Sequence, residues 1–161
     1  MFSLSKSTKF YWISISIIMI LLMSLPLVIT EAKEKEMLEK NGLKVTIFLF
    51  SGRQNPVYLL DDKDVINQLK TLIDASRVNE RFEKTTVIPS ILGYNGILVE
   101  NPANFPGFPA HLAVYKGNIE IKNERKKFLI DEDNAIENLL INQASEKGAI
   151  DEKAIKFIKS D

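Results

Sequence analysis

Apolar residues in this chain change their spacing along the sequence. An uncharged run covers residues 10–29, with Lys6 and Lys9 before it and a charge-dense stretch from Glu31 after it. From residue 43 on, some segments alternate apolar and polar residues, as strands do. Others repeat apolar residues every three or four positions, as amphipathic helices do. The pattern separates one N-terminal hydrophobic segment from a following domain.

The N-terminal run has about the ~20 residues that a helix needs to cross a bilayer core. Pro26 and the small residues Thr30 and Ala32 favour a cleaved signal peptide over residues 1–32. The run is longer than the usual signal core of ~7–15 residues, which favours an uncleaved signal anchor. Both alternatives keep the basic flank in the cytoplasm. We therefore expect an extracytoplasmic protein, secreted or membrane-anchored, in which only residues 10–29 contact the membrane.

Residues 33–42 are predicted as a charged linker, and residues 43–161 as one domain. The strand-like segments are residues 43–50, 57–60, 91–100, 111–122 and 128–130. In the hairpin, a turn at Gly117 and Asn118 is predicted to place Val114 opposite Ile121. The hairpin's other face is expected to be wetter. Gly93 and Gly96 predict a bulge in the strand over residues 91–100.

Three amphipathic helices are predicted from apolar stripes that begin next to acidic residues. Asp61 is expected to cap the first helix, which ends at about Ser76, while Asp131 and Asp151 cap the other two. Gly148 is expected at the end of the second helix. This order has too few strand–helix alternations for a doubly wound sheet. It predicts a single α+β domain, with a mainly antiparallel sheet, helices on one face, and the hydrophobic export segment in front.

Composition removes several classes of function. The chain has no cysteine, which excludes disulfides and a lipid-modified cysteine anchor. Beyond residue 32 the acidic and basic residues nearly balance, so we expect no nucleic-acid partner and see no electrostatic case for an anionic membrane surface. With one histidine and no HExxH motif, the sequence predicts no metal site and no cofactor.

Candidate chemistry is sparse. His111 is the only possible base for a Ser-His-Asp triad, and no nucleophile elbow accompanies it, so a solvated hairpin histidine is favoured. The acidic clusters at residues 61–64 and 131–133 lack the spacing of a calcium loop. They are interpreted as helix caps.

Two segments are candidates for binding. In residues 51–56, Arg53 could clamp a carboxylate or phosphate, but the favoured alternative is that Arg53 and Asn55 hold the turn through loop carbonyls. In residues 92–96, Tyr94 and Asn95 lie between glycines. Tyr94 is either an exposed stacking group or packs at a glycine bulge.

The two motifs, SGRQNP and LGYNG, resemble those of a family of small uncharacterised bacterial proteins, many of them exported. The resemblance covers residues 43–148. It implies a recurring single domain and brings no established activity, catalytic residue or cofactor.

These observations favour a non-enzymatic binding or interaction module of the cell envelope, whose partner is an unknown protein or small ligand. The alternative is a small extracytoplasmic hydrolase or an enzyme inhibitor. The loop at residues 105–108 could add to the binding surface. The predicted binding residues are Arg53, Asn55, Tyr94, Asn95 and His111, and no catalytic residue is predicted.

Overall fold

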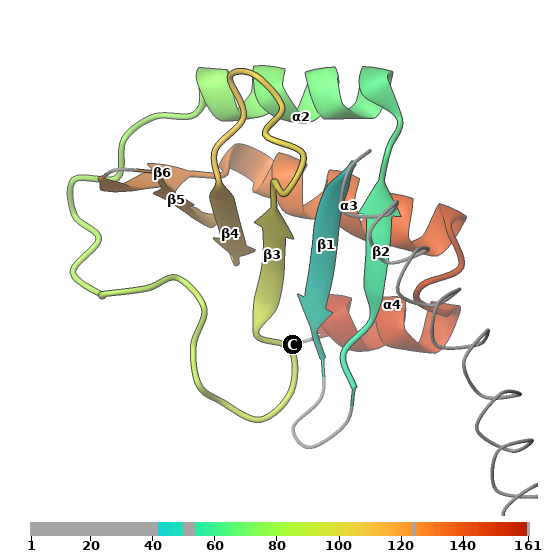
Figure 1. Ribbon diagram of the computed structural model, residues 1–161. Helices are drawn as coiled ribbons and strands as arrows, with labels where there is room; N and C mark the ends of the chain where they lie inside the picture. Colours follow the sequence, from blue (N-terminus) through green and yellow to red (C-terminus); the bar gives the residue numbers. More distant parts are fainter. Residues whose placement is uncertain (1–41, 50–53, 124, 161) are drawn as a thin grey trace, which may run out of the picture. The chain divides into compact units, whose positions relative to one another are not determined.

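A computed structural model describes residues 42–49, 54–123 and 125–160. The described residues form an open antiparallel sheet of six strands in the order β2-β1-β3-β4-β5-β6, with three α-helices (Figure 1). The strands are β1 (Leu43–Phe48), β2 (Val57–Leu60), β3 (Gly96–Glu100), β4 (His111–Tyr115), β5 (Asn118–Lys122) and β6 (Lys126–Ile130). The helices are α2 (Lys63–Ala75), the 3-10 helix η1 (Glu132–Asn134), α3 (Ala135–Glu146) and α4 (Glu152–Ser160). The predicted α+β class is confirmed, while the predicted export segment lies outside the described residues.

The α-helices lie on one face of the sheet, where the apolar residues of the strands form the core (Figure 1). Fully buried side chains from β1, β3 and α3 meet there: Leu43, Val45, Ile47, Ile97, Val99 and Leu140. The Tyr58 hydroxyl on β2 donates a 2.7 Å hydrogen bond to the carbonyl oxygen of Leu140 on α3. Burial raises the pKa of Tyr58, so this hydroxyl keeps its proton and its role as donor. The bond ties an edge strand to the helical layer.

The first residue of α2 was predicted one position too early. Asp62, not Asp61, caps the helix, since its carboxylate accepts hydrogen bonds from the N–H groups of Asp64 at 2.9 Å and Val65 at 3.3 Å. Asp61 instead forms a 2.8 Å ion pair with Lys147, beyond the end of α3. Two adjacent aspartates offer the same capping chemistry, and only the distant lysine separates their roles.

The predicted cap of α4 agrees with the structure, and that of α3 agrees only in part. Asn134 occupies the N-cap position of α3, but the Asp131 carboxylate accepts the N–H groups of Ile136 at 2.9 Å and Glu137 at 3.0 Å, reaching across η1 to the first turn of the helix. Gly148 ends this helix with φ +68°, and Asp151 accepts the Ala154 N–H at 2.8 Å to start α4. The patterns at Gly148 and Asp151 are local, whereas η1 separates Asp131 from the helix that it holds.

The β4–β5 hairpin keeps its predicted faces but not its predicted register. Val114 pairs with Ile119, and the turn consists of Lys116 and Gly117, whose φ angles are 44° and 76°. Positive φ at both turn residues matches the twist of a two-residue hairpin, which explains why this turn forms instead of one at Gly117 and Asn118. The shift of two positions leaves every side chain on its expected face.

The strand predicted over residues 91–100 begins only at Gly96. Gly93 and Gly96 have φ angles of 101° and 105°, and a Cβ built on Gly96 would lie 2.4 Å from the Val114 carbonyl oxygen. Glycine is thus required where β3 enters the sheet against β4. Residues 91–95 form a turn before the strand, in which the Asn95 side-chain amide donates to the Ile91 carbonyl oxygen at 2.9 Å.

The hairpin pattern predicts that the face of the sheet opposite the helices is solvent-exposed. The structure shows that part of this face is buried. Glu120 and Ala113 are 8% and 7% exposed, because residues 77–88 cross the outer side of the last strands. The Glu120 carboxylate accepts the Val87 N–H at 3.0 Å and forms a 2.6 Å ion pair with Lys126. The same segment bridges to β6 through Val78 and Leu129, which covers that edge of the sheet.

Candidate functional site

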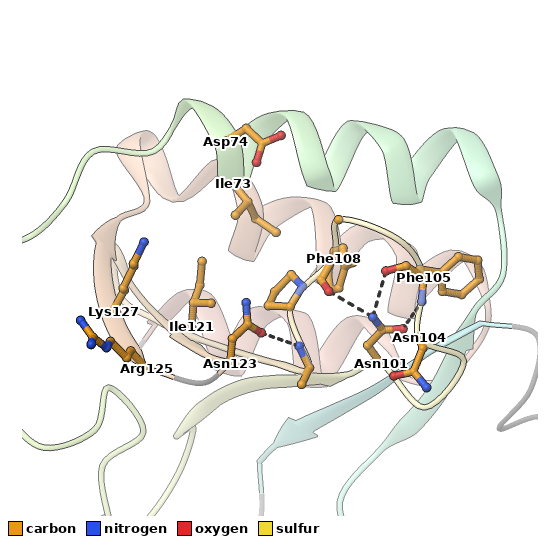
Figure 2. Close-up of a pocket in the computed structure, with 13 residues that line it drawn as sticks. Ile73, Asp74, Asn101, Asn104, Phe105, Phe108, Ile121, Asn123, Arg125 and Lys127 are labelled. Atoms are coloured by element: carbon orange, nitrogen blue, oxygen red, sulfur yellow. Dashed lines mark hydrogen bonds between the residues drawn. The ribbon is translucent and has the colours of Figure 1, made fainter.

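The loop between β3 and β4, residues 101–110, forms one wall of a cleft (Figure 2). Asn101 holds this loop together. Its side-chain amide donates to the carbonyl oxygens of Phe105 at 3.3 Å and Phe108 at 3.2 Å, and its side-chain oxygen accepts the Phe105 N–H at 2.9 Å. Asn101 is 7% exposed, so these bonds are protected from water. The breaker-rich loop is therefore a fixed wall, built around one asparagine.

The cleft has a volume of about 800 Å³ and lies between this loop, the last turn of α2 and the β5–β6 connection (Figure 2). Its apolar residues are Ile73, Phe105, Phe108, Pro109 and Ile121. Asn123 belongs to the β5–β6 connection, and its side-chain oxygen accepts the Ala110 N–H at 2.9 Å. This bond fixes the two walls to each other and leaves the Asn123 amide donors directed at the cleft (Figure 2).

Two cations line one end of the cleft, away from Phe105 (Figure 2). Arg125 and Lys127 are both exposed, and neither has a hydrogen bond or ion pair with any described residue. Among the described residues that line the cleft, the acidic one is Asp74, which is paired with Lys70. The cleft therefore combines an apolar middle with a positive end, and a guanidinium beside an ammonium suits a carboxylate or a phosphate.

Two of the residues predicted from the sequence, Asn55 and Asn95, lie together at the end of β1. The Leu49 N–H donates to the Asn55 side-chain oxygen at 3.0 Å, and the Asn95 N–H donates to the Phe48 carbonyl oxygen at 2.8 Å. Each asparagine thus secures the chain next to the end of β1. Arg53 lies outside the described residues, so its predicted clamp stays a prediction.

Tyr94 is buried, which corresponds to the packed alternative and not to an exposed stacking group. Its ring is 1% exposed and lies 5.9 Å from the Tyr115 ring. The Tyr94 hydroxyl donates to one carboxylate oxygen of Glu137, whose other oxygen accepts the Lys116 N–H at 3.1 Å. This network connects the segment before β3, the β4–β5 turn and α3.

The two carboxylates at the start of α3 are held in an environment that disfavours their charge. Burial raises the pKa of Glu137, and the neighbouring Asp131 adds to the rise, against hydrogen bonds from Tyr94 and Lys116 that lower it. Burial also raises the pKa of Asp131, despite the backbone N–H groups that it accepts. All four oxygens have partners in the fold, so a structural role accounts for both groups.

His111 lies at the start of β4, with Glu100 and Lys122 beside it in the ladder. It lines a small cleft of about 220 Å³ with Glu120. Its side chain makes no hydrogen bond with a described residue. Burial alone would raise the pKa of Glu120, but hydrogen bonds from Lys126, Thr86 and the Val87 N–H lower it overall. Glu120 is thus an engaged structural carboxylate, not a base held ready for proton transfer.

The acidic clusters have roles within the fold. Asp61, Asp62 and Asp131 serve in an ion pair and two caps, as described above. In the part of the chain that the structure describes, no group of three or more potential ligands is placed to hold a metal ion. Across the same residues, none of the helices is both long enough and apolar enough to span a bilayer.

Comparisons with protein-family models, curated proteins and solved structures found no match to this chain. The resemblance drawn from the SGRQNP and LGYNG motifs stays a prediction.

Most residues of the cleft were not among those predicted from the sequence. The proline-rich loop had been noted, and residues 105–108 were named as a possible surface, yet nothing linked them to Arg125 and Lys127. The sequence feature that could have pointed to the cleft is the cationic stretch at residues 125–127, which follows the predicted hairpin. Only the tertiary fold shows that this stretch faces the loop.

Proposed function

We propose that this protein is an extracytoplasmic binding module whose cleft takes a small amphipathic anion. The carboxylate or phosphate of the ligand binds between Arg125 and Lys127, and its apolar part packs against Ile121 and Phe108. The observation that carries the proposal is a pair of cations, unpaired with any described residue, at one end of a cleft whose middle is lined by apolar side chains. The export predicted for residues 1–32 supplies the location.

The composition of the cleft supports binding over catalysis. Pockets for small ligands are mostly apolar, with a few polar groups that orient the ligand, and they commonly have volumes of roughly 300–1,000 Å³. The cleft contains no histidine, and its aspartate is paired with Lys70. Hydrolysis would need a reactive group, and among the described residues His111 lies in a different, smaller cleft.

The test uses the full-length chain in phosphatidylcholine nanodiscs and the soluble probe 4-phenylbutyrate, with uncharged 4-phenylbutanol as the matched ligand. We expect saturable binding of the acid and at least tenfold weaker binding of the alcohol, because a charge-assisted hydrogen bond contributes about 1.5–3 kcal/mol. The double variant Arg125→Gln/Lys127→Gln should lose the preference for the acid. The control Lys63→Gln/Lys84→Gln removes two exposed charges elsewhere and should keep it.

Equal binding of the acid and the alcohol would contradict an anion site, and loss of binding in the control variant would show that only overall charge matters. Location is tested separately. Protease added to intact protoplasts should digest an anchored protein, and recovery of the full-length chain from the cytoplasm of its native host would contradict export.

A further inference from the structure

The side-chain amide of Asn123 is held with its two donors open to the cleft. The Ala110 N–H donates to the Asn123 side-chain oxygen at 2.9 Å. Because a backbone N–H needs an acceptor, this bond decides which end of the amide faces the loop. The amide nitrogen of Asn123 then points into the cleft (Figure 2), and it has no hydrogen bond with a described residue. The cleft thus contains an oriented donor that the described part of the fold does not use.

This donor lies between the apolar middle of the cleft and its positive end. The bond to Ala110 places Asn123 beside the loop segment that carries Phe108. On the other side, Ile121 lies two residues before Asn123, a stretch of at most ~7 Å. Ile121 pairs with Lys127 across the β5–β6 ladder, where opposite Cβ atoms are about 5 Å apart. A ligand that extends from Phe108 to Lys127 therefore passes the Asn123 amide.

Three kinds of chemistry follow one another along the cleft: apolar side chains, a neutral hydrogen-bond donor and two cations. The apolar side chains pack an apolar group, the donor suits a carbonyl oxygen, and the cations suit an anion. A ligand that matches all three carries an apolar group, then an amide carbonyl, then a carboxylate. A fatty acid has no acceptor at the middle position, so the Asn123 donors would bind only water beside it.

We propose that the cleft selects N-acylated amino acids and that Asn123 recognises their amide carbonyl. The Asn123 Nδ2 donates to the carbonyl oxygen, Arg125 and Lys127 bind the carboxylate, and the acyl group packs against Phe108. This inference rests on the proposed function, because it needs the two cations to bind an anion, and it names the class of that anion. Two sources offer the same chemistry: a free N-acyl amino acid and the carboxyl end of a peptide.

The test compares two acids of equal length and charge, N-phenylacetylglycine and 5-phenylpentanoate, in which two methylene groups replace the amide. Both are titrated into the full-length chain in phosphatidylcholine nanodiscs. The readout is the Kd of 5-phenylpentanoate divided by the Kd of N-phenylacetylglycine. The variant Asn123→Asp keeps an oxygen for the Ala110 N–H and replaces the amide donors with an acceptor.

The charge that Asn123→Asp introduces weakens both acids alike, so the ratio isolates the donor. We expect the ratio to fall about tenfold, because one hydrogen bond is lost and two acceptor oxygens face each other. The control Asn104→Asp adds the same charge to the same cleft and leaves Asn123 in place, so it should keep the wild-type ratio.

An equal ratio in the wild type and Asn123→Asp would overturn the inference, and so would an equal fall in Asn104→Asp. If 4-phenylbutyrate still binds more tightly than 4-phenylbutanol, such a result leaves the proposed function standing. Absence of saturable binding by every acid would overturn both.

The two sources are separated with N-acetylphenylalanylglycine, which has the same carboxyl end on a peptide backbone. Tighter binding of this peptide than of N-phenylacetylglycine, with the same response to Asn123→Asp, would support a peptide end as the ligand. Weaker binding would support a free N-acyl amino acid.

Discussion

The hydroxyl of Tyr94 donates a hydrogen bond to the carboxylate of Glu137, and both side chains are almost completely buried. The two residues come from the turn before β3 and from the first turn of α3. Burial raises the pKa of Tyr94, so the phenol keeps its proton and its role as a donor. This polar contact thus connects the segment before β3 to the helical layer inside the core, as the Tyr58 hydroxyl does for β2.

Replacing Tyr94 with phenylalanine should destabilise the protein by about 1–3 kcal/mol, because one Glu137 oxygen would remain buried without its donor. The measurement is the free energy of unfolding from denaturant titration. The control Tyr115→Phe removes a hydroxyl that has no hydrogen-bond partner among the described residues, and it should cost much less. Equal losses in the two variants would show that the Tyr94 hydroxyl contributes little.

The raised pKa of Glu137 makes its contribution to stability depend on pH in a defined direction. The folded state holds the proton more tightly than the unfolded state does, so the contribution is fully present below the ordinary value of 4.5. It is lost as the pH rises through the raised folded-state pKa. Asp131 follows the same direction from its ordinary value of 3.8.

The difference in unfolding free energy between the wild type and Glu137→Gln isolates this effect, because glutamine does not titrate. Wild type should lose stability relative to the variant as the pH rises from below 4.5 towards neutrality. Glu120 gives the opposite control, since its lowered pKa means that its contribution is lost as the pH falls. A difference that does not vary with pH would contradict the raised pKa of Glu137.

The sequence predicted those parts of the fold that depend on neighbouring residues. The strand at Leu43, the cap at Asp151 and the helix end at Gly148 each rest on a few adjacent positions, and the structure confirms them. The place of Lys116 in the β4–β5 turn could not be predicted, because a positive φ at a lysine has no sequence signature. The burial of Glu120 could not be predicted either, because the residues that cover this side chain lie about 30 positions earlier in the sequence.

The candidate cleft shows the same limit more strongly. Its residues come from α2, the β3–β4 loop and the β5–β6 connection, which are far apart in the sequence. A proline-rich loop with Asn101 and a cationic stretch at Arg125 have no common pattern until the sheet brings their ends together. The sequence analysis identified the loop but not the cationic stretch, and only tertiary packing made them a site.

Asn101 should be the residue on which the cleft wall depends. Asn101→Ala removes three side-chain hydrogen bonds to the loop backbone, and we expect a loss of about 1–3 kcal/mol together with weaker binding of 4-phenylbutyrate. The control Asn104→Gly changes a residue of the same loop that has φ 51° and no side-chain hydrogen bond with a described residue. Glycine accepts that angle, so stability should change little. A larger loss at residue 104 than at residue 101 would contradict this account of the loop.

Two glycines with positive φ should respond very differently to alanine. At Gly96 the added Cβ would lie 2.4 Å from the Val114 carbonyl oxygen, which belongs to the neighbouring strand and cannot move without breaking the β3–β4 ladder. At Gly148 no atom lies within 4 Å of the added Cβ. Gly148→Ala should therefore cost only the left-handed backbone strain, about 1–2 kcal/mol. Gly96→Ala should cost several kcal/mol more, or prevent folding. Thermal unfolding of both variants checks this, and similar melting temperatures would show that β3 enters the sheet with more room than the structure indicates.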